Sequence, residues 1–155
     1  MAEGPTIHAS AVLIGAKAVL IRGPSGAGKS SLAWAVIEAG RPGGPLTFAR
    51  LVGDDRVVVE AKAGRLLVRP APTLAGLIEI RGVGIRMTTY EKAAAVGLVV
   101  DLAASDAARL PAHEAENTMI SGVSLPRLAV AAGGNALAMV LAWLGTTRGT
   151  AQTPD

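Results

Sequence analysis

The sequence predicts a single α/β domain, a mixed β-sheet flanked by helices and organised around a P-loop. Its 155 residues are the length of one ordinary domain. Short apolar, β-rich runs alternate with helical stretches along it. Between one such run, AVLI at 18–21, and a helical pattern stands RGPSGAGKSS at 22–31, which fits the Gly-x-x-x-x-Gly-Lys-Ser of a phosphate-binding loop. We place the domain at residues 1–145 and expect a disordered polar tail at 146–155.

The composition favours a protein of a reducing compartment. Half of the residues are hydrophobic but only 3% are aromatic, so the core must be built mainly from Ala, Val, Leu and Ile. Cysteine is absent, which excludes disulfides and thiolate zinc sites. No basic, apolar leader begins the sequence, and a cytoplasmic location is therefore the expectation.

The charge balance suits a phosphorylated or acidic partner but argues only weakly for one. Fifteen Lys and Arg against twelve Asp and Glu give a net charge of +3 and a pI near 9.8. Binding to single-stranded nucleic acid usually adds aromatic side chains on which bases stack, and one Phe, one Tyr and two Trp supply few of these. We therefore expect no nucleic-acid partner.

An uncharged stretch from Leu128 to Thr147 raises the question of a membrane segment. Gly133-Gly134-Asn135 interrupts it, and the apolar helix left at 136–144 would rise only about 14 Å against roughly 30 Å of bilayer hydrocarbon. The stretch instead predicts a buried helix with Asn135 as its N-cap and Gly145 just past its end. No membrane contact is expected.

The first elements surround the P-loop. Apolar runs at 11–14 and 18–22, on either side of Gly15-Ala16-Lys17, predict a hairpin whose second strand leads into the loop. A helix from Lys29 to Glu38 should follow and end at Gly40. An antiparallel hairpin next to a strand–loop–helix unit makes the sheet mixed rather than purely parallel.

The later part of the chain predicts further strands after the surface loop GRPGGP. The prolines at 70 and 72 should close a hairpin, and the short apolar run GLVVDL is typical of a buried strand. The expected strands are 49–52, 56–61 and 65–69 around a turn at 62–64, 97–102, and a last pair at 118–120 and 125–130.

The P-loop residues carry the most specific chemistry in the chain. Its glycines let successive backbone N–H groups turn toward phosphate oxygens, and the following helix adds its positive N-terminal end. Lys29 should bridge the terminal phosphates, and the Ser30 hydroxyl should bind Mg²⁺. The predicted phosphate-binding set is Gly23, Pro24, Ser25, Gly26, Ala27, Gly28, Lys29, Ser30 and Ser31.

A P-loop also needs an acidic residue for the metal, usually at the end of a neighbouring apolar strand. RLVGDD ends in Asp54-Asp55, and GLVVD ends in Asp101. An adjacent pair of carboxylates can divide two tasks, one holding Mg²⁺ and one taking the proton of an attacking hydroxyl, which a lone Asp101 cannot. The alternative for the pair is a solvated turn, and Asp101 is more simply a structural residue.

The stretch LIEIRGVGIRM at 77–87 places Glu79 and Arg81 two residues apart. In an extended segment these side chains point to the same side, so a metal-binding carboxylate and a phosphate-binding guanidinium would share one face. An exposed, salt-bridged strand that ends in a turn is an equally good interpretation. His8 before the first strand and His113 in PAHEAEN are each more typical of solvated histidines.

Taken in order, these motifs resemble the catalytic domain of bacterial HPr kinase/phosphorylase. The resemblance rests on His8, the P-loop at Gly23–Ser30, LVGDDRV at 51–57 and EIRGVGI at 79–85, and it spans about residues 7 to 130. It implies an Mg²⁺-dependent kinase that moves a phosphoryl group from ATP, or in some members pyrophosphate, to a serine of HPr, a small phosphocarrier protein. Many members also run the reverse phosphorolysis.

The resemblance also implies roles for individual residues. Asp54 corresponds to the catalytic acid/base, with His8 near it. Ser30, Asp55 and Glu79 correspond to the metal group. Lys29 and the loop backbone form the phosphate cradle, and Arg81 supports the Glu79 site or the phosphates.

Two departures from the longer family members stand out. Those members carry an N-terminal domain, whereas this sequence resembles the short forms that begin at the catalytic part. They have Gly-Arg-Asn where this chain has Gly133-Gly134-Asn135, so an arginine expected to help with phosphate or partner contacts is replaced by Gly134. The longer members form hexamers, which implies a homo-oligomer here.

Two other functions are compatible with the P-loop. A small-molecule kinase would need a preformed pocket in place of a groove for a protein loop. A nucleotide-sensing regulator would bind ATP without transferring phosphate, but binding alone needs only the metal ligand and not both Asp54 and Asp55.

Overall fold

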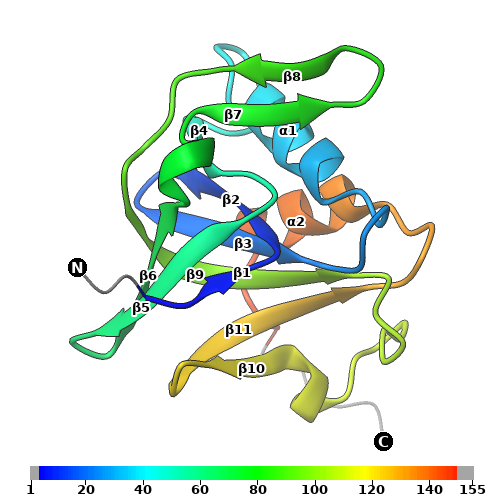
Figure 1. Ribbon diagram of the computed structural model, residues 1–155. Helices are drawn as coiled ribbons and strands as arrows, with labels where there is room; N and C mark the ends of the chain where they lie inside the picture. Colours follow the sequence, from blue (N-terminus) through cyan, green and yellow to red (C-terminus); the bar gives the residue numbers. More distant parts are fainter. Residues whose placement is uncertain (1–3, 150–155) are drawn as a thin grey trace, which may run out of the picture.

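The computed structural model describes residues 4–149, which form a mixed sheet with two helices on it (Figure 1). Within that range the sheet has nine strands, and β7 and β8 make a separate two-stranded sheet. The strands are β1 Thr6–Ile7, β2 Ala9–Ile14, β3 Lys17–Arg22, β4 Ala49–Gly53, β5 Val57–Lys62, β6 Arg65–Pro70, β7 Leu77–Ile80, β8 Gly84–Met87, β9 Ala94–Leu102, β10 Asn117–Ile120 and β11 Val123–Val130. The helices are α1 Lys29–Ala39 and α2 Ala136–Gly145, with short 3-10 helices η1 Pro72–Leu74 and η2 His113–Glu116.

Strand β9 is the centre of the sheet. It pairs in parallel with β3 on one side and with β11 on the other, and its first residues also pair antiparallel with β6. Outward from β9, the order β1-β5-β6-β9-β3-β2-β4 continues through antiparallel pairs, of which β5–β6 and β2–β3 are hairpins. The predicted mixed α/β fold is thus confirmed, and the parallel β3–β9 pair brings the carboxyl ends of both strands to the edge where the P-loop begins.

The sheet curls and buries a hydrophobic cluster on each face. One cluster joins the two halves of the curl through buried side chains such as Leu20, Leu66 and Val99. The other lies between the sheet and both helices and includes Val36 of α1 and Val140 of α2. Both helices therefore pack on the same face, and β7 joins them there.

Helix α1 follows the predicted limits closely, but the prediction of a buried C-terminal helix is wrong. Asn135 does cap α2, since its Oδ1 accepts a hydrogen bond from the Ala138 N–H at 3.1 Å, and the helix runs one residue further than expected, to Gly145. Only Val140 is fully buried. The helix lies on the outside of the sheet and packs through one face only, so most of its apolar side chains stay partly exposed.

Three strand predictions are corrected by pairing that the local pattern does not reveal. β9 begins at Ala94, three residues before the predicted start, because Ala94 and Ala95 pair with β6. β11 begins at Val123 because Ser121-Gly122 makes a two-residue turn with positive φ at both positions. Residues 77–87 form a β-hairpin that turns after Ile80, so Arg81 lies in the turn and not in an extended segment with Glu79.

The ends of the described chain bear on two further expectations. Among residues 4–149 no helix is long and apolar enough to cross a membrane. Of the predicted tail, residues 146–149 are described, and Arg148 there pairs with Glu116 at 2.7 Å. Residues 150–155 lie outside the described part, so the expected disorder is not tested.

Candidate active site

The P-loop joins β3 to α1 and wraps the N-terminus of the helix. Gly28 caps α1 with φ +100, in the left-handed region that glycine adopts without strain. A Cβ on Gly23 would lie 3.1 Å from the Leu102 Cβ, so the start of the loop packs directly on the end of β9. The Lys29 ammonium donates to the carbonyl oxygens of Gly23 and Pro24 at 2.8 and 3.2 Å. A phosphate in the loop would compete for these bonds.

Asp54 links the P-loop to two other segments. It directly follows β4 and is only 3% exposed. Its carboxylate accepts hydrogen bonds from the hydroxyls of Ser10 at 2.5 Å and Ser30 at 2.8 Å, and from the Glu79 N–H at 3.0 Å. These donors satisfy a charge that would be costly to bury alone. The alternative of a solvated turn does not hold for Asp54.

Ser10 is a site residue that the sequence analysis missed. It is fully buried in β2, next to β4, and its hydroxyl donates to Asp54. The only signal in the sequence is a serine at an inward position of an otherwise apolar strand, and that pattern does not specify a partner.

Most of the other predicted site residues meet in a polar cavity of about 290 Å³. Asp55, Glu79 and Arg81 face Lys29 and Ser30 across it. Glu79 is exposed on β7, which ends in a turn after Ile80, as the alternative interpretation expected. Its salt bridge is absent, because neither Glu79 nor Arg81 forms an ion pair among residues 4–149. The cavity is lined by Ser25, Gly26, Gly28, Lys29, Ser30, Ser31, Asp55, Glu79 and Arg81.

The oxygen donors of this cavity fit Mg²⁺ by their chemistry. Within the described residues no three acidic or histidine side chains come close enough to form a metal cage. Mg²⁺ at nucleotide sites takes one or two carboxylates and completes its octahedron with phosphate oxygens and water. The Ser30 hydroxyl and the nearby carboxylates match that requirement.

A second, more apolar cavity of about 560 Å³ adjoins the other side of the P-loop. Its walls include Leu102, Val130 and Leu137, and Gly134 contributes to its rim. No charged side chain lines it. The two cavities share Ser25, Gly26, Gly28 and Ser31. A molecule held by the loop can therefore extend into a polar cavity on one side and an apolar cavity on the other.

His8 lies apart from both cavities. It is exposed at the junction of β1 and β2, and its Nε2 accepts a hydrogen bond from Arg56 at 3.0 Å. Arg56 comes directly after the Asp54-Asp55 pair in the chain. Its hydrogen bond to His8 is therefore the link that connects His8 to the site. His113 begins η2, far along the chain from this group.

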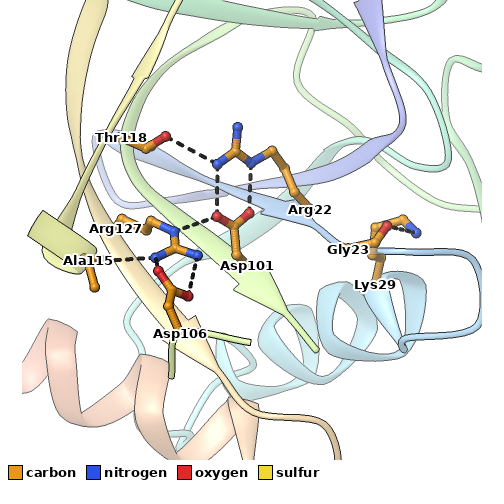
Figure 2. A network of polar contacts seen from close by, with 8 residues as sticks. All are labelled: Arg22, Gly23, Lys29, Asp101, Asp106, Ala115, Thr118 and Arg127. Atoms are coloured by element: carbon orange, nitrogen blue, oxygen red, sulfur yellow. Dashed lines mark hydrogen bonds and ion pairs between the residues drawn. The ribbon is translucent and has the colours of Figure 1, made fainter. Parts of the chain in front are cut away.

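Asp101 belongs to a separate ionic network beside the P-loop (Figure 2). Its carboxylate accepts from Arg22 Nε and Nη2 at 2.7 and 2.8 Å and from Arg127 Nε at 2.6 Å. Arg127 also donates to Asp106 at 2.7 Å. With both oxygens occupied by guanidinium groups, Asp101 is a structural residue that joins β9 to the end of β3 and to the middle of β11.

The same network shifts the acidity of its members. Burial by itself would raise the pKa of the Asp101 carboxyl, but hydrogen bonds and positive charge from Arg22 and Arg127 outweigh it and hold that pKa below its ordinary value. The hydrogen bond from Arg127 likewise lowers the pKa of the exposed Asp106. Asp101 therefore stays ionised at neutral pH and keeps both arginines in place.

A Gly-x-x-x-x-Gly-Lys-Ser loop whose serine bonds a strand-end aspartate, on a mixed sheet, defines a P-loop α/β protein. Within that class the chain belongs to the HPr serine kinase C-terminal domain family, whose family model matches residues 1–144. The match includes the P-loop, the aspartate pair and the β7–β8 hairpin.

Individual relatives agree with this family. The chain is 36% identical over 141 residues to an HPr kinase/phosphorylase of Streptococcus pneumoniae (strain Hungary19A-6), covering 84% of this chain and 43% of that protein. It is 45% identical over 86 residues to one of Streptococcus thermophilus (strain ATCC BAA-491 / LMD-9), covering 55% and 25%. The chain thus spans less than half the length of these relatives.

A solved structure has the same fold. The Hpr(Ser) kinase/phosphatase from Coxiella burnetii superposes with a TM-score of 0.72 at 22% identity, over 91% of this chain and 94% of that chain. The superposition covers nearly the whole of both chains and supports a single folding unit.

Proposed function

We propose that this chain is the catalytic domain of a protein serine kinase that transfers a phosphoryl group from ATP or pyrophosphate to a serine of HPr. Family membership supports the proposal. The structural observation that carries it is the contact of Ser30 with Asp54, because it joins the P-loop to the strand end where Asp55 faces Glu79 and Arg81. Neither a small-molecule kinase nor a nucleotide sensor is favoured by any contact in the site.

The donor binds through the loop. Backbone N–H groups from Gly23 to Ser30 and the Lys29 ammonium hold its terminal phosphates. The apolar cavity beside Leu102 and Val130 accommodates a nucleoside, which supports ATP as donor, whereas pyrophosphate would use the loop alone. Arg81 contributes positive charge from the far side of the polar cavity.

Mg²⁺, held by the Ser30 hydroxyl and one carboxylate of the Asp54-Asp55 pair, would supply positive charge to the transferred phosphoryl group. In the step itself the serine oxygen of HPr forms a bond to the terminal phosphorus, while the bond from phosphorus to the leaving ADP or orthophosphate oxygen breaks. The hydroxyl proton passes to an aspartate carboxylate of this chain. In reverse, an orthophosphate oxygen would bond to the phosphoserine phosphorus while the bond from that phosphorus to the serine oxygen breaks; the products are pyrophosphate and serine, whose oxygen takes the proton back from the aspartate.

The two aspartates divide metal binding and proton acceptance between them. The family resemblance assigns the proton to Asp54 and the metal to Asp55. Burial of Asp54 and its bond to Ser30 favour the opposite division, with Asp55 exposed toward the acceptor. The variants Asp54→Asn and Asp55→Asn distinguish the two: loss of the metal ligand raises the Mg²⁺ concentration needed for half-maximal rate, whereas loss of the base lowers kcat at every Mg²⁺ concentration.

The proposal is tested by the intact mass of HPr after incubation with this protein, Mg²⁺ and either ATP or pyrophosphate. One added phosphoryl group, mapped to a serine and absent with Lys29→Met, is the expected result and identifies the donor. Unmodified HPr in the presence of measured nucleotide binding would refute the kinase and return the question to small-molecule acceptors or a sensor.

Three further features belong to the same proposal. The protein would act in the cytoplasm, as a homo-oligomer, and without the arginine that longer members have at the position of Gly134. Since Gly134 lies on the rim of the apolar cavity, that arginine would be next to the donor. Phosphorolysis by this chain is therefore expected to be slow relative to its kinase reaction.

A further inference from the structure

The β7–β8 hairpin stands outside the main sheet and is held by one strand. The buried Ile78 of β7 packs in the cluster between the sheet and α1, whereas all four residues of β8 are exposed. Figure 1 shows the hairpin above α1 with β8 as its outer strand. Within the described chain β8 pairs only with β7.

The exposed residues of this hairpin are unusually apolar. Val83 is 62% exposed at the turn, and Ile85 and Met87 on β8 are 70% and 83% exposed. Large apolar side chains that gather on one exposed element mark an interaction surface more often than scattered ones do. We call Val83, Ile85 and Met87 the apolar strip.

Strand register places two residues of this strip, Ile85 and Met87, on the face of the hairpin that carries a residue of the polar cavity, Glu79. Ile85 lies directly opposite Glu79, and Met87 lies opposite Leu77. Side chains at directly opposite positions of an antiparallel pair share one face. Ile85 is therefore on the same face as the Glu79 carboxylate that lines the cavity, and Met87 follows roughly 7 Å further along the strand.

We propose that the apolar strip is the docking surface for the acceptor protein, and that it receives apolar side chains close to the serine that is phosphorylated. The inference rests on the proposed function. The proposal is based on the closeness of the strip to the polar cavity. If the acceptor serine places its hydroxyl beside Asp55 and Glu79, the acceptor residues next to that serine lie over Ile85 and Met87. The strip itself has no charged side chain, so the fitting segment is apolar rather than acidic or basic.

The test uses the double variant Ile85→Thr/Met87→Thr, which keeps β-favouring side chains while it removes most of the apolar surface. The KM for HPr and the KM for the phosphoryl donor are measured separately. The acceptor KM should rise roughly tenfold or more, because the lost apolar contacts belong to acceptor binding. The donor KM should change less than about twofold, since the P-loop is untouched.

Met119→Thr is the matched control, because Met119 is 68% exposed on another edge strand, β10, away from both cavities. It should leave both KM values unchanged. An unaltered acceptor KM in the double variant would overturn the docking proposal while the kinase stands. A change in oligomeric mass that accounts for the whole effect would overturn it in favour of self-association. Failure of the wild type to phosphorylate HPr would refute the proposed function and this inference together.

Discussion

Asp54 is the residue on which the geometry of the site depends most directly. Its carboxylate is bonded by β2 through Ser10, by the first turn of α1 through Ser30, and by β7 through the Glu79 N–H. Each donor limits where that segment can move relative to the P-loop. The neighbouring Asp55, with φ +69, turns outward into the cavity instead.

Ser10→Ala tests the support that Asp54 receives from β2. Without this hydroxyl a buried carboxylate loses one of its donors, and we expect a loss of roughly 1–3 kcal/mol in the free energy of unfolding. Urea unfolding followed by circular dichroism measures it. Ser124→Ala, at an exposed position of β11, is the control and should change stability little. Equal losses of stability in the two variants would show that the hydrogen bond from Ser10 to Asp54 does not stabilise the fold.

Gly28→Ala tests the left-handed cap of the P-loop. No atom lies within 4 Å of a Cβ at this position, so the cost comes from φ +100 alone and should be roughly 1–2 kcal/mol. Nucleotide affinity, measured by calorimetry, should fall as well because the loop N–H groups are displaced. Gly145→Ala is the control: it has equal space in the last position of α2 and should be neutral or stabilising. A Gly28→Ala protein as stable as the wild type would contradict the argument.

At the scale of elements, ion pairs join the three neighbouring strands β3, β9 and β11. Arg22 of β3 and Arg127 of β11 both donate to Asp101 of β9. Because Arg22 immediately precedes Gly23, this network fixes the position at which the P-loop begins after β3 (Figure 2). The arginines leave Asp101 no free oxygen for a metal, which is why it is no rival to the Asp54-Asp55 pair.

Asp101→Asn tests the network through its pH dependence. The folded protein lowers the pKa of Asp101 from an ordinary 3.8, so its contribution is complete above that value and is lost as pH falls through the lower, folded pKa. At pH 7 the variant should be less stable by roughly 2–3 kcal/mol, somewhat below the range for a fully buried pair. Urea unfolding across pH should show this difference shrink below about pH 4. A difference independent of pH would mean that the charge of Asp101 does not contribute.

At the scale of the whole molecule, two sheets of different size share one domain. The nine-stranded sheet of the described chain packs a buried hydrophobic cluster on each face, whereas the β7–β8 hairpin is attached through β7 and the Asp54–Glu79 contact. Local opening costs least where few buried contacts are lost. The hairpin is therefore expected to open without unfolding of the main sheet.

Hydrogen exchange measured residue by residue tests this division. Amides of β9 in the centre should exchange at the rate set by global unfolding, and those of β8 should exchange much faster. The Glu79 amide should be the slow exception within the hairpin, because it donates to the buried Asp54. Equal protection of β8 and β9 would show that both sheets unfold as one cooperative unit.

The sequence by itself determined what depends on neighbours along the chain. Short patterns of glycines, capping residues and alternating apolar residues predict the P-loop, the start of α1 at Lys29, the Asn135 cap and the hairpins of the main sheet. These patterns limited the acidic partner of the P-loop to three candidates, Asp54, Asp55 and Asp101. The family resemblance then assigned proton acceptance to Asp54 and metal binding to Asp55.

Tertiary structure decided what depends on distance through space. The partners of Asp54 lie 44 and 24 residues away, and Arg22 lies 79 residues from Asp101. No local pattern specifies such pairs, because they follow from strand order and register. For the same reason the exposure of α2 could not be read from its composition: a helix is buried by what packs on it, and only one face of α2 meets the sheet.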